Sequence, residues 1–281
     1  MLLSSWGPSR PFPSRFQAAA ECGNYSRREM PPRGEVASTT AQLRVRAFMP
    51  SGRLSYRVTE MAPSAGLGAY AAKPGPYFAG ARIDFVEDLP DDPNAVILEI
   101  GCGSGGTGRL AIAKGKCARY YGVELNAQAA CEAAEVLHEV ICGDVEAISL
   151  PWASEQFDAL LMSEVLEHLA DPWSVLRKLH PLLKPGALVL AGSPNVAHYQ
   201  VIMMLLRGDW QLTDSGVMDR THLRWFTPRT YARMFEETGY EVLSTMGIGT
   251  GGLKARIASK LLLGRCEWLW ARQIKVTARR R

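Results

Sequence analysis

The chain has 281 residues, 47% of them hydrophobic, which is enough to bury one full core in a domain of about 200 residues. Its net charge of +4 conceals an uneven distribution: residues 1–60 carry +5, residues 254–281 carry +8, and residues 61–253 therefore carry −9. An acidic body argues against nucleic acid as the main partner. The sequence contains no apolar run of about 18 residues, so we expect no membrane span.

Six cysteines are scattered along the chain, at positions 22, 102, 117, 131, 142 and 266, and none forms a C-x-x-C pair. This spacing argues against a disulfide or zinc framework and favours a reducing compartment, so we expect a cytoplasmic protein. The basic residues of 254–281 are expected to form a solvated terminus, or to make peripheral contact with an anionic membrane surface.

Residues 1–60 contain six prolines among many Ser, Arg and Ala residues, and no period of 2 or 3.6 persists. We therefore expect a disordered or loosely packed N-terminal extension, followed by one domain over 61–281. After an irregular lead-in, a helix is predicted over 77–89 from a rough apolar face made by Phe78, Ile83, Phe85, Val86 and Leu89.

Strand and helix patterns then alternate, which predicts an α/β fold with a doubly wound, mostly parallel, seven-stranded sheet and helices on both faces. Ligand sites in such a sheet lie at the carboxyl ends of the strands. The predicted strands are 96–100, 120–124, 140–142, 157–162, 187–191, 240–246 and 272–277. A helix is predicted after the first strand and ends near residue 114. Five more helices are predicted, over 126–139, 172–183, 199–206, 227–238 and 253–263.

Residues 96–106 read VILEIGCGSGG, an apolar strand that runs into closely spaced glycines. Glycine permits a tight turn and a close ligand approach, and the free N–H groups of the following helix suit an anionic or strongly polar ligand. Gly101, Gly103 and Gly106 satisfy the dinucleotide fingerprint G-x-G-x-x-G. Glu99, Gly101, Gly103 and Gly105 also satisfy E/D-x-G-x-G-x-G, so the loop alone leaves two cofactor classes open.

Acidic residues end the next two predicted strands. Glu124 stands 23 residues after Gly101, where a carboxylate can accept two hydrogen bonds from a ribose diol, and Asp144 stands where an adenine edge would lie. Both cofactor classes contain these groups. A short-chain dehydrogenase would also need a Tyr-x-x-x-Lys pair, which the sequence lacks, so a nicotinamide cofactor is disfavoured.

The segment from 157 to 195 distinguishes the two classes. It combines an F-D strand start, the run EVLEHL at 164–169, Asp171-Pro172 and the turn LKPG at 183–186. Together with the glycine loop, Glu124 and Asp144, this order resembles class I S-adenosylmethionine-dependent methyltransferases over roughly residues 77–281. The resemblance implies a Rossmann-like methyltransferase fold and S-adenosylmethionine as the cofactor.

The resemblance also implies roles for individual residues. Gly101, Gly103 and Gly105 would hold the methionine part of the cofactor, with Glu99 near its amino group. Glu124 would hold the ribose hydroxyls. The adenine would meet the Asp144 side chain and the Val145 N–H, and Ser163 and Glu164 would lie near the methyl donor and acceptor.

Methyl transfer to oxygen requires alignment of donor and acceptor, and in some enzymes a base. Three histidines are candidates for a direct role: His168 in EVLEHL, His198 after strand 187–191, and His222 in DRTHLRW. A lone histidine is more often a structural hydrogen-bonding group than a base, so that alternative stays open for each of them. His, Asp and Glu do not cluster at ligand spacing along the chain, so no metal is expected.

Residues 194–226 form a polar and aromatic insertion, which we expect to lie on the acceptor side. Its P-N-V-x-H, G-x-W and DRTHLRWFT patterns are similar to methyltransferases found with glycosyltransferases in bacterial cell-surface polysaccharide synthesis. The chemistry suits a sugar, because tryptophans offer flat apolar faces and charged groups can bind hydroxyls or phosphates. The candidate acceptor-binding residues are Trp210, Asp219, Arg220, Arg224 and Trp225, with Asp214 and Phe226 as further contacts; Trp225 and Phe226 could instead fill the core.

Three hypotheses follow. The first is an O-methyltransferase that acts on a sugar or glycan precursor. The second is a small-molecule methyltransferase with a quinone or phenolic acceptor, which an apolar pocket without Asp219 and Arg224 would favour. The third is a protein that binds the cofactor as the partner of another enzyme and transfers no methyl group.

Overall fold

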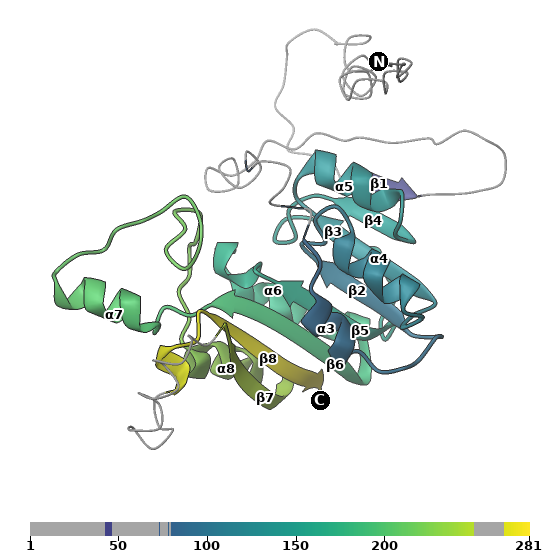
Figure 1. Cartoon of the computed structure of the whole chain (residues 1–281). Helices are drawn as coiled ribbons and strands as arrows, with labels where there is room; N and C mark the ends of the chain where they lie inside the picture. Colours follow the sequence, from purple (N-terminus) through teal and green to yellow (C-terminus); the bar gives the residue numbers. More distant parts are fainter. Residues whose placement is uncertain (1–42, 47–72, 74–77, 79, 250–266) are drawn as a thin grey trace, which may run out of the picture. The chain divides into compact units, whose positions relative to one another are not determined.

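The computed structural model describes residues 43–46, 73, 78, 80–249 and 267–281, and these form one mixed sheet with helices (Figure 1). The strand order is β1-β4-β3-β2-β5-β6-β8-β7. The strands are β1 (Leu43–Arg46), β2 (Val96–Ile100), β3 (Arg119–Glu124), β4 (Glu139–Cys142), β5 (Phe157–Ser163), β6 (Leu183–Pro194), β7 (Tyr240–Ile248) and β8 (Gln273–Arg280). The α-helices are α3 (Ile83–Asp88), α4 (Gly106–Ala113), α5 (Ala127–Ala134), α6 (Pro172–Leu179), α7 (Tyr199–Leu206) and α8 (Pro228–Glu237). Short 3-10 turns are η2 (Leu166–His168), η3 (His180–Leu182) and η4 (Glu267–Leu269).

All seven predicted strands are present, as β2 to β8. Strands β4, β3, β2, β5 and β6 run parallel, and β8 pairs antiparallel with both β6 and β7. The predicted doubly wound, mostly parallel sheet is therefore confirmed. One further strand, β1, pairs antiparallel with β4. It lies within the segment 1–60, for which no regular structure was expected; the rest of that segment lies outside the described residues.

The core has two parts, one on each face of the sheet. Alternate residues of β2 show the division, because Ile97 packs on one side and Leu98 and Ile100 on the other. Side chains of α3, α4 and α5 cover the first face, and those of α6 and α8 cover the second. Every residue of β2 is buried, as expected for a central strand covered on both faces.

Local signals fix where several helices begin. The Asn126 side chain accepts a hydrogen bond from Ala129 N and so caps the N-terminus of α5. Asp171 caps α6 in the same way, with Pro172 at the first helical position. Thr227 forms a capping box with Thr230 at the start of α8.

Other boundaries differ from the sequence expectation. Helix α3 begins only at Ile83, whose side chain is exposed rather than part of the apolar face. Helix α5 ends at Ala134, because the chain must already leave it for His138 N to bond Tyr120 O and start β4. Strand β6 absorbs the predicted turn at 184–186 through a register shift against β5. The predicted helix 253–263 lies outside the described residues.

Residues 273–280 of the basic C-terminus are built into the sheet as β8, which corrects the expectation of a solvated terminus there, whereas peripheral membrane contact stays a prediction. Strand β8 lies between β6 and β7. Within it, buried Lys275 forms ion pairs with Asp84 (3.4 Å) and Asp88 (2.9 Å), and Arg279 pairs with Glu241 (2.8 Å). In the part of the chain that the structure describes, no helix is long and apolar enough to cross a bilayer.

Candidate active site

The glycine loop joins β2 to α4 and is held from two sides. Gly101 N and Cys102 N both donate to Val123 O in β3, at 2.7 and 3.2 Å. Gly103 has a φ of +53°, and a Cβ there would stand 2.5 Å from the main-chain oxygen of Phe78. Glycine is therefore required at 103, both by the backbone angle and by the close approach of the chain at Phe78.

Glu124 ties this loop to the end of β3. Its Oε2 accepts a hydrogen bond from Gly103 N and its Oε1 one from Asn126 N, each at 2.8 Å. The side chain is buried, and burial raises the pKa of its carboxyl. A carboxylate has about four lone-pair sites on its two oxygens, so it can accept hydrogen bonds from a ligand hydroxyl in addition to those from the main chain. The carboxylate thus stands, already oriented, at the place where the sequence predicted a ribose contact.

Glu99 lies behind the loop and does not line the cavity described below. It is buried in β2 and accepts a hydrogen bond of 2.9 Å from the Tyr120 hydroxyl. Burial raises its pKa from 4.5 to about 7, while the bond from Tyr120 acts in the opposite direction. Its predicted place near the amino group of the cofactor remains a prediction.

Glu99 makes the stability of the cofactor-free protein depend on pH. The folded state holds its proton more tightly than the unfolded state, so stability falls as pH rises from about 4.5 through about 7. The shift corresponds to roughly 3 kcal/mol. Glu99→Gln keeps an acceptor for Tyr120 but cannot titrate. We expect denaturant unfolding to show the variant gaining stability relative to the parent between about pH 4.5 and about pH 8. If the difference in free energy of unfolding between variant and parent is the same at about pH 4.5 and at about pH 8, this expectation is wrong.

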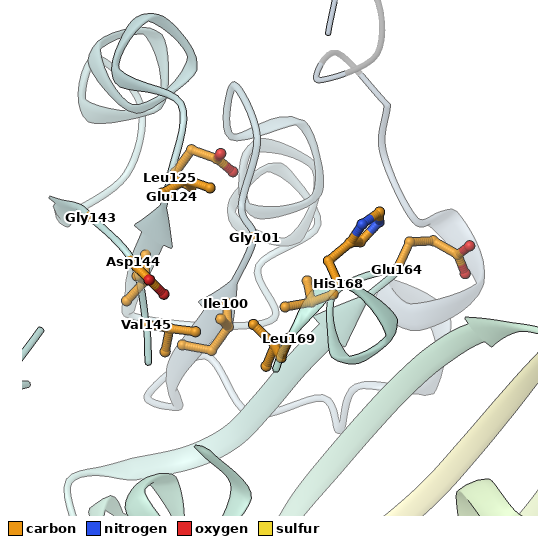
Figure 2. A pocket seen from close by; sticks show the side chains of 12 residues that line it. Ile100, Gly101, Glu124, Leu125, Gly143, Asp144, Val145, Glu164, His168 and Leu169 are labelled. Carbon is orange, nitrogen blue, oxygen red and sulfur yellow. The ribbon is translucent and has the colours of Figure 1, made fainter. Parts of the chain in front are cut away.

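A cavity with about 440 Å³ of empty space, including its open mouth, lies at the carboxyl ends of β2, β3, β4 and β5. Figure 2 shows Glu124 and Asp144 on one side of it and His168 and Glu164 on the other, with Ile100 and Gly101 between them. Val145 also lines it, whereas Gly103, Gly105 and Ser163 do not. The predicted ribose and adenine residues are thus brought together at one end of this cavity.

At the opposite end, β5 runs into the turn that carries Glu164. The backbone of Glu164 has a φ of +55°, and burial raises the pKa of its carboxyl to about 7. Beside it, Arg82 Nη1 donates to Ser163 Oγ at 2.5 Å. Arg82 was not among the predicted site residues, because the helix predicted over 77–89 included it. In the structure α3 begins at Ile83, so Arg82 lies just before the helix.

Two of the three candidate histidines meet. The rings of His168 and His222 lie edge to face with centroids 4.8 Å apart. Nδ1 of His168 donates to Thr221 O at 3.2 Å, and Nδ1 of His222 donates to Val217 O at 3.1 Å. Burial lowers both pKa values, that of His168 to about 4, so both rings are neutral at neutral pH.

His198 stands apart from this pair. It is the N-cap of α7, where its Nδ1 accepts from Gln200 N, and its ring packs against Tyr199. It does not line the cavity. The contacts of His198 are those of a structural capping residue.

Glu167 joins His168 and His222 in a buried group whose potential ligand atoms all lie within 4.8 Å of one another. These residues are far apart along the chain, so no metal was expected from their spacing. In the folded chain they come together because residues 221–224 fold back onto η2. Leu223 N and Arg224 N both donate to Glu167 O, at 2.8 and 3.0 Å.

The predicted acceptor-binding residues do not converge on the cavity. Trp210 and Trp225 pack edge to face with centroids 5.4 Å apart and stay partly exposed, while Phe226 is buried in the core. Arg220 pairs with the exposed Asp214 at 2.9 Å, and Arg224 donates to Ala170 O. Asp219 is buried and forms an ion pair of 2.5 Å with Lys73. None of these residues lines the cavity.

The glycine turn, the oriented Glu124 and the open cavity at the strand ends fit the cofactor that the motifs implied. A family model described as a methyltransferase domain matches residues 75–245. The chain belongs to this family. The methyltransferase is an enzyme whose cofactor is S-adenosylmethionine, and both a nicotinamide enzyme and a non-catalytic binding protein are set aside.

Relatives and solved structures agree with this assignment. The methyltransferase is similar to the ubiquinone biosynthesis O-methyltransferases of Aeromonas salmonicida (27% identity, 54% of this chain, 65% of the relative) and Pseudomonas aeruginosa (26%, 59% and 73%). The match to the first spans less than two thirds of that relative. Among solved structures, S-adenosylmethionine-dependent methyltransferases from Mesorhizobium loti (18% identity, TM-score 0.51, 72% of this chain and 98% of that one) and Aquifex aeolicus (14%, 0.50, 77% and 99%) share the fold.

Proposed function

We propose that this methyltransferase transfers the methyl group of S-adenosylmethionine to a hydroxyl oxygen of a small phenolic or quinone-precursor acceptor. The observation that carries the proposal is the lining of the acceptor end of the cavity. Val165, Leu169 and Ile100 contribute apolar surface there, and Glu164 and His168 are the ionisable groups beside it. An apolar wall with few polar groups suits an aromatic ring that carries hydroxyls.

The comparisons support this acceptor over a sugar. Relatives at 26–27% identity are named O-methyltransferases of ubiquinone biosynthesis. The residues proposed for a sugar are engaged elsewhere, since Arg220 pairs with Asp214 and Asp219 pairs with Lys73. The condition that distinguished the two acceptors, a cavity without Asp219 and Arg224, is met.

The cofactor supplies the activated methyl group, and the residues of this chain align the reactants. Glu124 would hold the ribose hydroxyls and Gly101 the methionine part, and Asp144 and Val145 line the cavity where the adenine is expected. Arg82 fixes the Ser163 hydroxyl beside the transfer site. His168 places a neutral imidazole at the acceptor end of the cavity, where it assists removal of the proton from the acceptor hydroxyl.

The test supplies the full chain with S-adenosylmethionine carrying a trideuterated methyl group. 3,4-Dihydroxybenzoic acid and UDP-glucose are offered separately, and products are identified by mass spectrometry. We expect the label on the phenolic acid alone, and no label with the Gly103→Ala variant. Label on the nucleotide sugar alone would overturn the phenolic acceptor.

A glycan precursor is the second candidate, together with a role in polysaccharide synthesis. It is favoured by the partly exposed pair of Trp210 and Trp225, which offers aromatic faces for a pyranose outside the cavity. For either acceptor we propose a cytoplasmic reaction. Three cysteines of the described residues, Cys102, Cys117 and Cys142, are free thiols, which suits a reducing compartment.

A further inference from the structure

One carboxylate of the insertion joins two distant parts of the chain. The Asp219 side chain is buried, and its two carboxylate oxygens have different partners. Oδ2 accepts a hydrogen bond from Lys73 Nζ at 2.5 Å, across 146 positions of sequence. Oδ1 accepts from Thr221 N at 2.9 Å and from Thr221 Oγ1 at 2.7 Å. Asp219 is therefore anchored on one side and holds Thr221 on the other.

These bonds fix a tight turn over residues 219–222. His222 N donates to Asp219 O at 3.0 Å, which closes the turn, and the Asp219 carboxylate holds the N–H of the third residue, Thr221. An aspartate that begins a turn and accepts from the amide two positions later stabilises that turn. The peptide group between Thr221 and His222 thus has its N–H engaged inside the turn, which sets the direction of its carbonyl.

That carbonyl binds the ring of His168. Nδ1 of His168 lies 3.2 Å from Thr221 O. A carbonyl oxygen can only accept, so the proton of the neutral ring is on Nδ1 and the lone pair is on Nε2. His168 lines the cofactor cavity, whereas Asp219 and Lys73 do not. The turn over 219–222 therefore selects which nitrogen of a cavity-lining imidazole can accept a proton.

The charge of Asp219 is compensated by Lys73. Burial raises the pKa of the Asp219 carboxyl, but the hydrogen bonds from Lys73 and Thr221 outweigh burial and lower that pKa below its ordinary value. Lys73 Nζ also donates to Asp214 O at 2.7 Å, so the ammonium contacts the insertion at two points. A buried charge that loses its partner is strongly destabilised. The position of the Asp219 carboxylate therefore depends on Lys73.

We propose that Asp219, held by Lys73, is a positioning residue for methyl transfer, because it fixes the carbonyl that keeps His168 in the Nδ1–H tautomer. This inference rests on the role of His168 in the proposed function. The acceptor hydroxyl proton passes to Nε2, the oxygen forms the O–CH₃ bond, and the S–CH₃ bonding pair goes to sulfur. Without the anchor the ring can rotate or exchange tautomer, and the alignment that transfer requires is lost.

The first experiment observes the tautomer directly and needs no acceptor. The full chain is labelled with ¹⁵N-histidine, and NMR spectra that correlate the ring nitrogens with the ring protons are recorded at neutral pH. The signals of His168 are those that disappear in His168→Gln. We expect the Nδ1–H tautomer in the parent and a mixture of tautomers in Asp219→Ala. Asp209→Asn is the matched control, because Asp209 is an exposed carboxylate of the same insertion; it should keep the tautomer of the parent.

The second experiment tests whether Asp219 acts through His168. Asp219→Ala should lower kcat with a phenolic acceptor at least about tenfold, since misplacing a reacting group can cost about 100-fold. The acceptor KM should stay within about threefold of the parent, because the cavity lining is unchanged. In the His168→Gln background the same substitution should change kcat less than about twofold, because residues that act through one another are not additive. A merely structural role would lower kcat by the same factor in both backgrounds.

S-adenosylhomocysteine affinity checks that each variant is folded, and Lys73→Met, which removes the anchor of the carboxylate, serves as a second variant. The Nδ1–H tautomer alone in whichever variant folds, or an equal loss of kcat in the two backgrounds, would overturn the positioning role. A change of tautomer without methyl transfer to any phenol would overturn the proposed acceptor and leave the link between Asp219 and His168 standing.

Discussion

Replacing Gly103 with alanine is expected to weaken S-adenosylhomocysteine binding by about 100-fold or more, which corresponds to roughly 3 kcal/mol. The added Cβ would stand 2.5 Å from Phe78 O, a main-chain atom that cannot rotate away. The loop or the chain at Phe78 must therefore shift. Either movement disturbs the 2.8 Å bond from Gly103 N that orients Glu124. Calorimetric titration of the full chain measures the loss.

Gly115 provides a matched control for this variant. Its φ is +67°, similar to that of Gly103, but a Cβ there would meet no atom within 4 Å. Gly115→Ala should lose about 1 kcal/mol of stability from the left-handed backbone and keep the cofactor affinity of the parent. If both alanine variants bind equally well, the close approach at Gly103 does not shape the cofactor site.

Replacing His168 with glutamine is expected to lower kcat by about 100-fold or more while leaving S-adenosylhomocysteine affinity within about threefold, the typical loss for a group that assists proton removal. His168 is the imidazole among the cavity-lining residues and lies opposite Glu124 and Asp144 (Figure 2). Its removal affects the acceptor end and spares the nucleoside end. Initial rates with a phenolic acceptor, measured at saturating cofactor, test this directly.

His198→Ala distinguishes a catalytic from a structural histidine. His198 caps α7 and does not line the cavity, so we expect about 1 kcal/mol less stability and a kcat within about threefold of the parent. Unchanged turnover in His168→Gln, or a large loss in His198→Ala, would reverse the two assignments.

Much of the fold could be predicted because its signals are local. The buried run Val96–Ile100 and the glycines after it identify β2 and the turn before α4. Asn126, Asp171 and Thr227 each cap a helix that begins close to its predicted start. Glu124 and Asp144 could be placed because the ends of parallel strands meet at one edge of a sheet.

The acceptor side could not be predicted in the same way, because its geometry depends on contacts between distant residues. Glu167 meets His222 because main-chain hydrogen bonds bring residues 223–224 back to η2. The sequence of residues 207–226 has no hydrophobic period that would indicate this return. Arg82 reaches Ser163 across 81 positions, and Lys73 reaches Asp219 across 146. The charged residues of the insertion look like sugar ligands in sequence, yet Asp214 and Arg220 pair with each other.

The most direct test of the account is a calorimetric titration of the full chain with S-adenosylhomocysteine, with NAD in a parallel cell. We expect one site per chain with micromolar affinity for S-adenosylhomocysteine and no heat from NAD. Absence of S-adenosylhomocysteine binding, or binding of NAD in its place, would contradict it at its foundation.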